Sequence, residues 1–525
     1  MLFHFLGSYF EAYEGFISTL VSGTFTHPCI FDWNNDLQFL LLPVYAYVNQ
    51  YLPNIQVYGI ALFIFTWCSL SFLGILLFNT LQTIRTQSNI LFIILYCILS
   101  VDTLMNLSSN RIAFIIAVNV FWLTELYRYH KKPLNSLLVV LLFLTFTFAC
   151  LIRFEVVILC SVFYLIILFT FKKMYARSFI PLIISVSFFI VYNTLIISTA
   201  TEAKKVGFYK EKQFFDRNDI NYYKLQKDLQ LEVEALRIYQ ITDKEHFQLS
   251  FYESVSKKDH HVNKMFFLLD GVNYTSIQNI IKNSFETPNK IWYLIAFYFL
   301  LSVFIMYKLY NINKRYIFYA SFFFFFPILL CLYVKVPIRF TVPYYTILCC
   351  INVLICLHYD LVFYKRFCLL ISLPLIFILC AAVNNKTDYT TLDGMYKKGI
   401  NKLTQNTKTL SSDKKLVISN LNYNKFFPVD PFMKTTKQNA LFLNFYFFAS
   451  YKCYINTWNE ACNCDALSLK DKVDYIIAKE ALFIIDNSTL EFMIKYFKMK
   501  YNKNLIATKT AAFDEELNIY KLNYE

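Results

Sequence analysis

The sequence predicts a polytopic α-helical membrane protein of about 10–12 spans, with an extracytoplasmic loop insert and a small C-terminal α/β domain. Three observations predict this fold class: a composition that is 57% hydrophobic and 16% charged, a series of apolar runs of membrane-spanning length, and two long polar stretches. Ordinary soluble proteins carry about a quarter charged residues. Because a soluble domain of this size could not bury so much apolar surface in one core, a bilayer is the natural solvent.

The apolar runs account for the predicted membrane part of the chain. About 20 apolar residues cross a bilayer, within a range of roughly 17 to 25. Ten runs fit this length: 57–79, 88–105, 111–127, 136–152, 154–172, 178–198, 291–310, 315–334, 338–358 and 366–383. The run 37–52 is short and carries Asn49 and Gln50, so we expect an interfacial or re-entrant helix there.

Two polar stretches divide the chain into four predicted segments. Residues 199–290 are rich in Lys, Asp, Glu and Asn and are too long for a simple connector, so they form a loop between the membrane regions 1–198 and 291–383. Residues 384–525 have the composition of an ordinary globular domain. Within them "KKLVISN" and "VDYIIAKE" are typical of short strands and "STLEFMIKYFKMKY" of an amphipathic helix, which predicts a small α/β domain.

Short basic connectors predict the orientation. They lie at 127–133, 172–177, 310–316 and 363–367. Threading the ten spans places all of them on one side, which is cytoplasmic because cytoplasmic loops carry an excess of Lys and Arg. The first loop 1–56, the 199–290 loop and the C-terminal domain are then outside. Residues 1–22 show no cleavable signal and make a poor span, so either they insert despite Glu11 and Glu14 or the true start lies upstream.

Charge and cysteine usage exclude several other classes of protein. The formal net charge of +14 does not indicate nucleic acid, because Lys and Arg are spread among short loops. The sequence has no Gly-rich phosphate loop, nucleotide fingerprint or zinc-type cysteine pairing. Outside the spans, Cys453 can form a disulfide with Cys462 or Cys464 in an oxidising compartment. Unpaired thiols are an equal alternative, and a metal site is a weaker one because no His accompanies them.

Three acids in the first loop are the candidate catalytic residues: Asp36, Asp32 and Glu14. A carboxylate just outside a membrane can act as a general base and take a proton from an acceptor hydroxyl. It can also hold a divalent cation together with a substrate phosphate, which is the cofactor these acids suggest. The alternative is that Asp32 and Asp36 only solvate a loop, with Asp36 capping a helix that starts near Leu37.

Basic side chains on the same predicted face are candidate ligands of a lipid phosphate: Arg153, Arg339, Arg111 and Lys335. Guanidinium groups fork onto phosphate oxygens, and at the outer headgroup level they would meet such a phosphate. Transfer of a sugar from a lipid phosphate needs a base for the acceptor and cations for the leaving phosphate. The alternatives are snorkelling of single arginines and an ion pair between Arg153 and Glu155.

Several pieces of the chain carry a family resemblance. They are "GFISTLVSGTFTHP" with the acidic loop after it, "LPVYAYVNQYLPNIQVYGI", the turn "IRFE", "VKVPIRFTVPYY" ahead of a late helix, and "FFPVDPF" and "YINTWNEACN" in the tail. By architecture and these loose motifs, most of the chain resembles the bacterial GT-C superfamily of integral-membrane glycosyltransferases. The resemblance implies a polyprenyl-phosphate-linked sugar as donor and a glycan, lipid or protein as acceptor. It also implies that a first-loop acid (Asp36, then Asp32, then Glu14) is the catalytic acid–base residue.

The resemblance further implies a multi-pass protein of the inner (plasma) membrane that meets membrane lipid and transfers its sugar outside the cytoplasm. An O-antigen-type polysaccharide polymerase or ligase is the first alternative, although such proteins usually lack a folded outer C-terminal domain. A glycan or lipid transporter is the second. It would predict charged or broken helices near the middle of the membrane and two similar halves, which this sequence does not have.

Overall fold

The computed structural model describes residues 9–10, 12–22, 24, 41–83, 89–170, 180–197, 231, 234–235, 292–310, 316–317, 319–321, 323, 338–363, 374–408, 416–419, 423–433, 438–443, 458–461 and 468–525. All helices, strands and contacts given below belong to this part of the chain. The chain divides into two compact units, each assembled from three separate stretches. Unit 1 consists of Met1–Glu14, Ile60–Asn193 and Leu269–Thr390, and unit 2 consists of Gly15–Gly59, Thr194–Leu268 and Thr391–Glu525.

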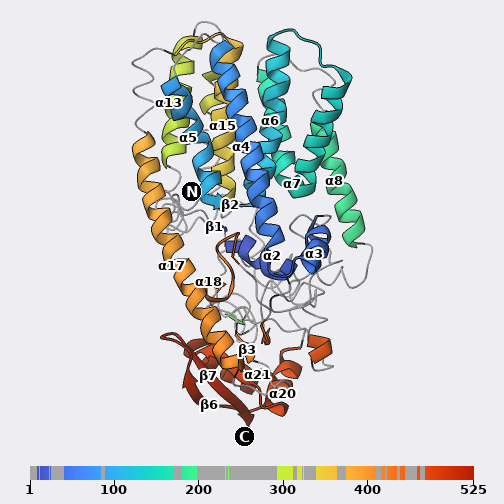
Figure 1. The fold of residues 1–525 in the computed structure, drawn as a ribbon, viewed down its shortest axis with the longest axis vertical. Coiled ribbons are helices and arrows are strands. Elements are labelled where there is room, and N and C mark those ends of the chain that lie inside the picture. Colours follow the sequence, from blue (N-terminus) through green and yellow to red (C-terminus); the bar gives the residue numbers. More distant parts are fainter. Residues whose placement is uncertain are drawn as a thin grey trace, which may run out of the picture. The chain divides into compact units, whose positions relative to one another are not determined.

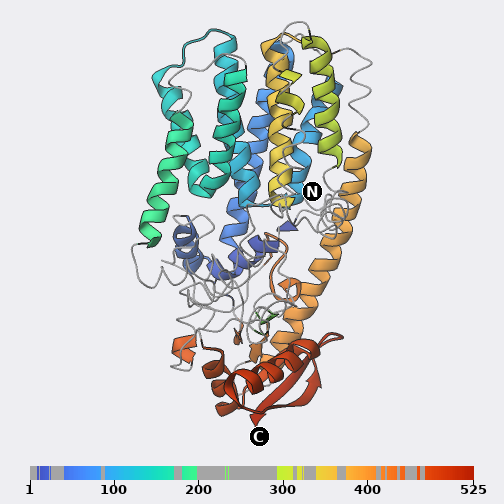
Figure 2. The ribbon, with the colours of Figure 1, turned by 180° about the vertical axis from the view of Figure 1, so that it is seen from behind.

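Unit 1 is built from apolar helices that lie side by side (Figures 1 and 2). They are α4 (Val57–Thr83), α5 (Asn89–Met105), α6 (Ser109–Tyr129), α7 (Ser136–Thr170), α8 (Ile180–Ile197), α13 (Trp292–Leu309), α15 (Ile338–His358) and the first part of α17 (Pro374–Lys408). Two short strands, β1 (Tyr9–Phe10) and β2 (Asn106–Leu107), pair in parallel within the same unit. The predicted apolar runs therefore form helices wherever the structure describes them.

Three described helical stretches are long and apolar enough to cross a membrane, judged by length and composition: Val57–Thr83, Ser109–Tyr129 and Ser136–Ile166, the last of which is interrupted at Arg153. Several others are apolar but shorter. Large apolar side chains are exposed along these helices, among them Trp67 at 62% and Leu137 at 68%. Extended exposed apolar faces are unusual on soluble monomers and suit a hydrocarbon solvent. The ten-span topology and its orientation stay predictions.

The helix α7 is two antiparallel helices rather than one. Arg153 interrupts it with non-helical dihedral angles, φ −160° and ψ 90°. Phe146 before this point and Tyr164 after it both contact Phe121 of α6, at ring-centroid distances of 5.7 and 4.3 Å. On a straight helix Phe146 and Tyr164 would be about 27 Å apart, so the chain reverses at Arg153. This confirms the turn predicted between the runs 136–152 and 154–172.

The helices α6 and α15 end without glycine, in a chain that has only 9 Gly. Lys131 after α6 (φ 52°) and Asp360 after α15 (φ 49°) adopt the left-handed conformation that glycine usually supplies. The amide of Lys132 then donates to the Tyr127 carbonyl (3.1 Å), and the Leu361 amide donates to a carbonyl in the last turn of α15 (2.9 Å). The carbonyls at both helix ends are therefore satisfied by the backbone that follows.

Unit 2 contains a five-stranded mixed sheet. Its strands are β3 (Leu416–Ile418), β4 (Ala440–Phe442), β5 (Leu482–Asp486), β6 (Leu505–Ala512) and β7 (Leu517–Tyr524). Their order is β4-β3-β5-β7-β6, with β3 parallel to both neighbours and β7 antiparallel to both of its own. The parallel strand β3 is an apolar run that is buried throughout, and in its neighbour β5 the central residues Phe483, Ile484 and Ile485 are buried, as expected for strands covered on both faces.

Two helices pack on this sheet: α20 (Leu469–Ala478) contacts β7, and α21 (Asn487–Tyr501) contacts β5 and β6. The predicted α/β character, the strand in "KKLVISN" and the helix in "STLEFMIKYFKMKY" are confirmed. The strand predicted in "VDYIIAKE" is wrong, because this segment belongs to α20 and the reversing turn after it. The Ser468 side chain caps that helix at the Asp471 amide (3.2 Å), and Leu469, Val473 and Ile476 form a buried helical stripe.

Three further helices belong wholly or mainly to unit 2. They are α2 (Ala12–Ser22), α3 (Leu42–Tyr51) and α18 (Tyr423–Phe426). The short helix expected within 37–52 is present as α3. The helix α17 runs for 35 residues, past the end of the predicted span at 383. The predicted division of the chain at 198, 290 and 383 stays a prediction, and most of the loop 199–290 lies outside the described residues.

Candidate functional site

The predicted catalytic acids are only partly described. Asp36 and Asp32 lie outside the described residues, whereas Glu14 lies in the first turn of α2. Their catalytic role stays a prediction. The cysteines of the predicted tail disulfide, Cys453, Cys462 and Cys464, also lie outside the described residues.

The first loop is bound to the C-terminal domain at two places within unit 2. Gly15 of α2 lies so close to the chain at Pro428 that a Cβ on Gly15 would be 2.4 Å from the Pro428 carbonyl oxygen. After α2, the amide of Gln438 donates to the carbonyl of Thr24 (2.8 Å). The segments "GFIST" and "FFPVDPF", both part of the family resemblance, are therefore neighbours in space. This contact positions the helix that leads into the acidic loop.

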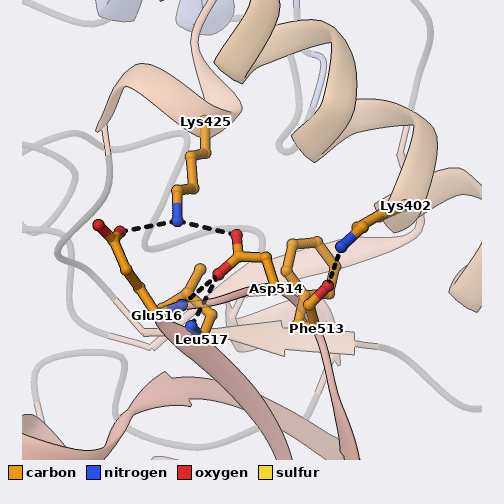
Figure 3. A network of polar contacts seen from close by, with 6 residues as sticks. All are labelled: Lys402, Lys425, Phe513, Asp514, Glu516 and Leu517. Atoms are coloured by element: carbon orange, nitrogen blue, oxygen red, sulfur yellow. Dashed lines mark hydrogen bonds and ion pairs between the residues drawn. The ribbon is translucent and has the colours of Figure 1, made fainter.

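The segment around Pro428, which contacts Gly15, is held in place by α17 and by the β6–β7 turn. Gly399 of α17 approaches the same segment, and a Cβ there would lie 2.2 Å from the Lys425 carbonyl oxygen. The Lys425 ammonium donates to Asp514 and Glu516 at 2.8 Å each (Figure 3). Lys402 of α17 donates to the Phe513 carbonyl at 2.5 Å. The sheet, α17 and α18 are therefore joined by contacts that hold the segment next to Gly15 in place.

Electrostatics strengthen these contacts. Burial of the Lys425 ammonium lowers its pKa, but the hydrogen bonds and charges of Asp514 and Glu516 outweigh that effect, so the pKa of Lys425 lies above its ordinary value. Burial raises the pKa of Asp514, but the hydrogen bonds from Lys425 and from the amides of Leu517 and Glu516 outweigh it, so its pKa lies below its ordinary value. Both groups are therefore charged across the neutral range.

Buried polar groups lie on α2, on α3 and in the turn after α3. Ser18 donates to the Gln56 side-chain oxygen at 3.1 Å, and both residues are buried. Among the described residues, the Asn49 Oδ1 and Gln56 Nε2 atoms are buried without a hydrogen-bond partner. Buried amide groups are normally paired, so these two atoms are candidates for binding water or a ligand. An amide oxygen and an amide nitrogen are suited to recognising hydroxyl groups.

Two of the four phosphate candidates, Arg111 and Arg153, form ion pairs with acids in unit 1. Arg111 Nε lies 2.5 Å from Asp102 Oδ2, and both side chains are buried. Asn106, which follows α5, donates to the same carboxylate at 3.2 Å. Arg153 lies at the α7 turn with its Nε 3.2 Å from Glu155. A lipid phosphate would have to compete with these carboxylates, so phosphate binding by Arg111 and Arg153 stays a prediction.

The remaining phosphate candidates are described less fully. Arg339 lies in the first turn of α15, and Lys335 lies outside the described residues. Over the described ranges, no three His, Cys, Asp or Glu side chains are grouped so that they could hold a metal ion. A divalent cation at the first-loop acids stays a prediction, because Asp32 and Asp36 do not belong to those ranges.

Sequence reasoning interpreted Asn49, together with Gln50, only as the mark of an interfacial helix, and it did not consider Gln56. The chain matches no protein-family model, no curated protein and no solved structure. What can be said of its chemistry follows from its own residues.

Proposed function

We propose that this chain is a membrane glycosyltransferase of the GT-C type. It moves a sugar from a polyprenyl-phosphate donor to a cell-surface glycan, lipid or protein acceptor on the extracytoplasmic face of the inner membrane. The observation that carries the proposal is the docking of the first loop on the C-terminal domain, through Gly15 with Pro428 and Thr24 with Gln438.

This contact supports the proposal in two ways. The basic connectors predict that the first loop and the tail lie on the same side of the membrane, and segments in contact must share a side. Catalytic groups are also commonly carried on loops that a rigid scaffold positions, and the network around Lys425 is such a scaffold.

Each group has a role in the proposed reaction. A first-loop acid, Asp36 before Asp32 and Glu14, takes the proton of the acceptor hydroxyl. Basic side chains from the set Arg111, Arg153, Arg339 and Lys335 stabilise the lipid phosphate as it leaves. A divalent cation held by the acids would add to that stabilisation.

The Asn49 Oδ1 and Gln56 Nε2 atoms, which have no partner among the described residues, supply hydrogen bonds to a sugar or acceptor hydroxyl. The exposed apolar helices supply the membrane location that a lipid-linked donor requires. One chain therefore carries both polar groups for a hydroxylated substrate and apolar helices suited to a membrane.

The proposal is tested with the purified chain in nanodiscs and a panel of radiolabelled polyprenyl-phosphate sugars. Binding and sugar release or transfer are measured for the wild type, Asp36→Asn, Asp32→Asn and Glu14→Gln. The wild type should bind one donor and transfer or release its sugar, and one acid variant should still bind while losing about 10²–10⁴-fold in rate.

The matched control is Glu491→Gln, which removes an exposed acid on α21 and should leave the rate unchanged. If no lipid-linked sugar binds to the wild type, the transferase proposal fails. Transport of a lipid or glycan is then the function to pursue. If donor binds but all three acid variants keep the wild-type rate, the first loop is not the source of the base.

A further inference from the structure

A cavity of about 300 Å³ lies within unit 1, between α6, the second half of α7 and α15. It is lined by residues of those three helices and of the turn after α6. This cavity is not part of the proposed first-loop site, and its polar lining residues lie toward the ends of α6 and α15. Those ends are neighbours, because the Tyr129 hydroxyl donates to the Asp360 carboxylate.

The inner wall of the cavity is apolar. Val118, Phe121, Leu168, Ile347 and Ile351 line it, together with two buried cysteines on α7 and α15. Phe121 stacks on Tyr164 with a centroid distance of 4.3 Å and an interplanar angle of 7°, which makes a flat aromatic surface on one side. A hydrocarbon chain is the chemistry that such a wall accepts.

The rim of the cavity is polar and carries more basic than acidic groups. Glu125, Arg128, Tyr129, Lys131 and His358 line it. The only carboxylate among these lining residues is already satisfied, since Arg128 lies 3.0 Å from Glu125 and the Tyr164 hydroxyl donates to it at 2.5 Å. Among these lining residues, the positive charge of Lys131 therefore has no carboxylate left to balance it.

Lys131 is available to a ligand for two reasons. Among the described residues, no carboxylate forms an ion pair with it. The carbonyls at the end of α6, which would otherwise attract an ammonium, accept hydrogen bonds from the amides of Lys131 and Lys132. The ammonium can therefore turn to an anion at the cavity mouth, beside the Arg128 guanidinium.

We propose that this cavity binds a lipid phosphate monoester with a single apolar chain. The phosphate lies at the rim against Lys131, next to the Arg128–Glu125 ion pair, and the chain lies against the wall formed by Phe121, Leu168 and Ile351. One chain is favoured over two because the volume is at the lower end of the range of roughly 300–1,000 Å³ for ligand pockets. An acyl lipid and a polyprenyl phosphate share this chemistry, and the site is independent of the sugar transfer proposed above.

The test is equilibrium binding of radiolabelled oleoyl lysophosphatidic acid to the purified full-length chain in detergent, with unlabelled lipids as competitors. Unlabelled fifty-five-carbon polyprenyl phosphate should displace the labelled lipid if the natural ligand is isoprenoid, and should not displace it if the natural ligand is an acyl lipid. Oleoyl lysophosphatidylcholine has the same chain, but its phosphate is a diester next to a cation. It should compete at least about tenfold more weakly, because a phosphate monoester forms the stronger charge-assisted hydrogen bonds.

Two neighbouring lysines supply a matched pair of variants. Lys131→Gln should weaken binding about tenfold through loss of a charge-assisted contact, whereas Lys132→Gln makes the same charge change at a residue that does not line the cavity. Lys132→Gln should leave the affinity within about twofold of the wild type. Leu354→Trp fills the cavity and should abolish saturable binding, with monodispersity in gel filtration as the check on its folding.

The proposal is overturned if no saturable binding of either phosphate monoester occurs. It is also overturned if both lysine variants weaken binding equally, because the effect is then one of surface charge. Equal competition by lysophosphatidylcholine would likewise overturn it, since the rim would then not recognise the phosphate. None of these readings depends on sugar transfer, so this proposal and the proposed function fail separately.

Discussion

At the scale of single residues, the ion pair between Asp102 and Arg111 is buried on both sides. Both side chains are removed from solvent, and their charges are separated by 2.5 Å. Two desolvated charges are tolerated only when each has its partner, so removal of one leaves an uncompensated charge. The pair therefore fixes the turn between α5 and α6.

Arg111→Met should destabilise the chain by about 3–5 kcal/mol, because Asp102 then stays buried without its cation. Asp102→Asn combined with Arg111→Met should recover most of that loss, since the amide is neutral and still accepts the hydrogen bond of Asn106. Unfolding by titration with sodium dodecyl sulfate in mixed micelles measures both variants. Equal losses in the single and double variants would show that the two charges are not coupled.

The ion pair of Lys425 with Asp514 predicts a pH dependence in unit 2. The pKa of Asp514 is below its ordinary value of 3.8, so its stabilising effect is present above that pH and is lost as the pH falls through the folded-state pKa. Hydrogen exchange at the amides of Glu516 and Leu517, which donate to Asp514, should lose protection below about pH 4.

Asp514→Asn should remove this acid transition and cost about 1.5 kcal/mol at neutral pH, the lower end for a hydrogen bond to a charged group, because Glu516 still pairs with Lys425. Glu516→Gln is the comparison, since that side chain is 62% exposed and Asp514 remains in place. An acid transition that persists in Asp514→Asn would assign it to another group.

At the scale of elements, glycines on helices set the close contacts that place the first loop. Gly399 and Gly394 lie on the same helix, α17, yet only Gly399 faces a backbone carbonyl. A Cβ at Gly394 meets no atom within 4 Å. The two positions therefore separate the effect of a close contact from the general effect of alanine in a helix.

Gly399→Ala should loosen the segment 423–433, because its methyl group would overlap the Lys425 carbonyl oxygen at a cost of about 1–3 kcal/mol. Gly394→Ala should instead stabilise α17 by about 0.5–1 kcal/mol. Hydrogen–deuterium exchange of peptides from 423–433 in the full chain measures the difference, at roughly tenfold in rate per 1.4 kcal/mol. Equal exchange in the two variants would mean that Gly399 is not a contact point.

Local patterns predicted most of the described helices, because a long apolar run has few other conformations open to it. The turn at Arg153 was predictable for the same reason, since a charged pair interrupts two runs of spanning length. The segment "VDYIIAKE" was predicted wrongly because a short apolar run fits a strand or a buried helix face equally well. The hairpin of β6 and β7 was missed, since its exposed strand carries Lys, Thr and Ala rather than a strongly alternating pattern.

The candidate site likewise contains contacts that the sequence could predict and contacts that it could not. Asp102 and Arg111 are close in sequence, so their proximity was predictable. The contact of Gly15 with Pro428 joins segments more than 400 residues apart, and no local pattern specifies it. The cavity between α6, α7 and α15 depends on how three distant helices pack, which periodicity alone does not determine.

At the scale of the whole molecule, the chain alternates between its two units. The first loop from Gly15 onward, the stretch Thr194–Leu268 and the tail from Thr391 belong to unit 2, while residues Met1–Glu14 and most of the apolar helices belong to unit 1. The central claim of the proposed function is that the first loop and the sheet domain share the extracytoplasmic side, opposite the connector after α6, as the basic connectors predict.

Cysteine accessibility in intact cells tests this claim most directly. Tyr51→Cys on α3 and Glu491→Cys on α21 are exposed positions in unit 2, and Lys132→Cys lies in the basic connector. A membrane-impermeant maleimide should label the first two variants in intact cells and Lys132→Cys only after permeabilisation, with the parental chain correcting for the 14 native cysteines. Labelling of Lys132→Cys in intact cells would contradict the account. So would labelling of only one of Tyr51→Cys and Glu491→Cys in intact cells, because the two residues would then lie on opposite sides of the membrane.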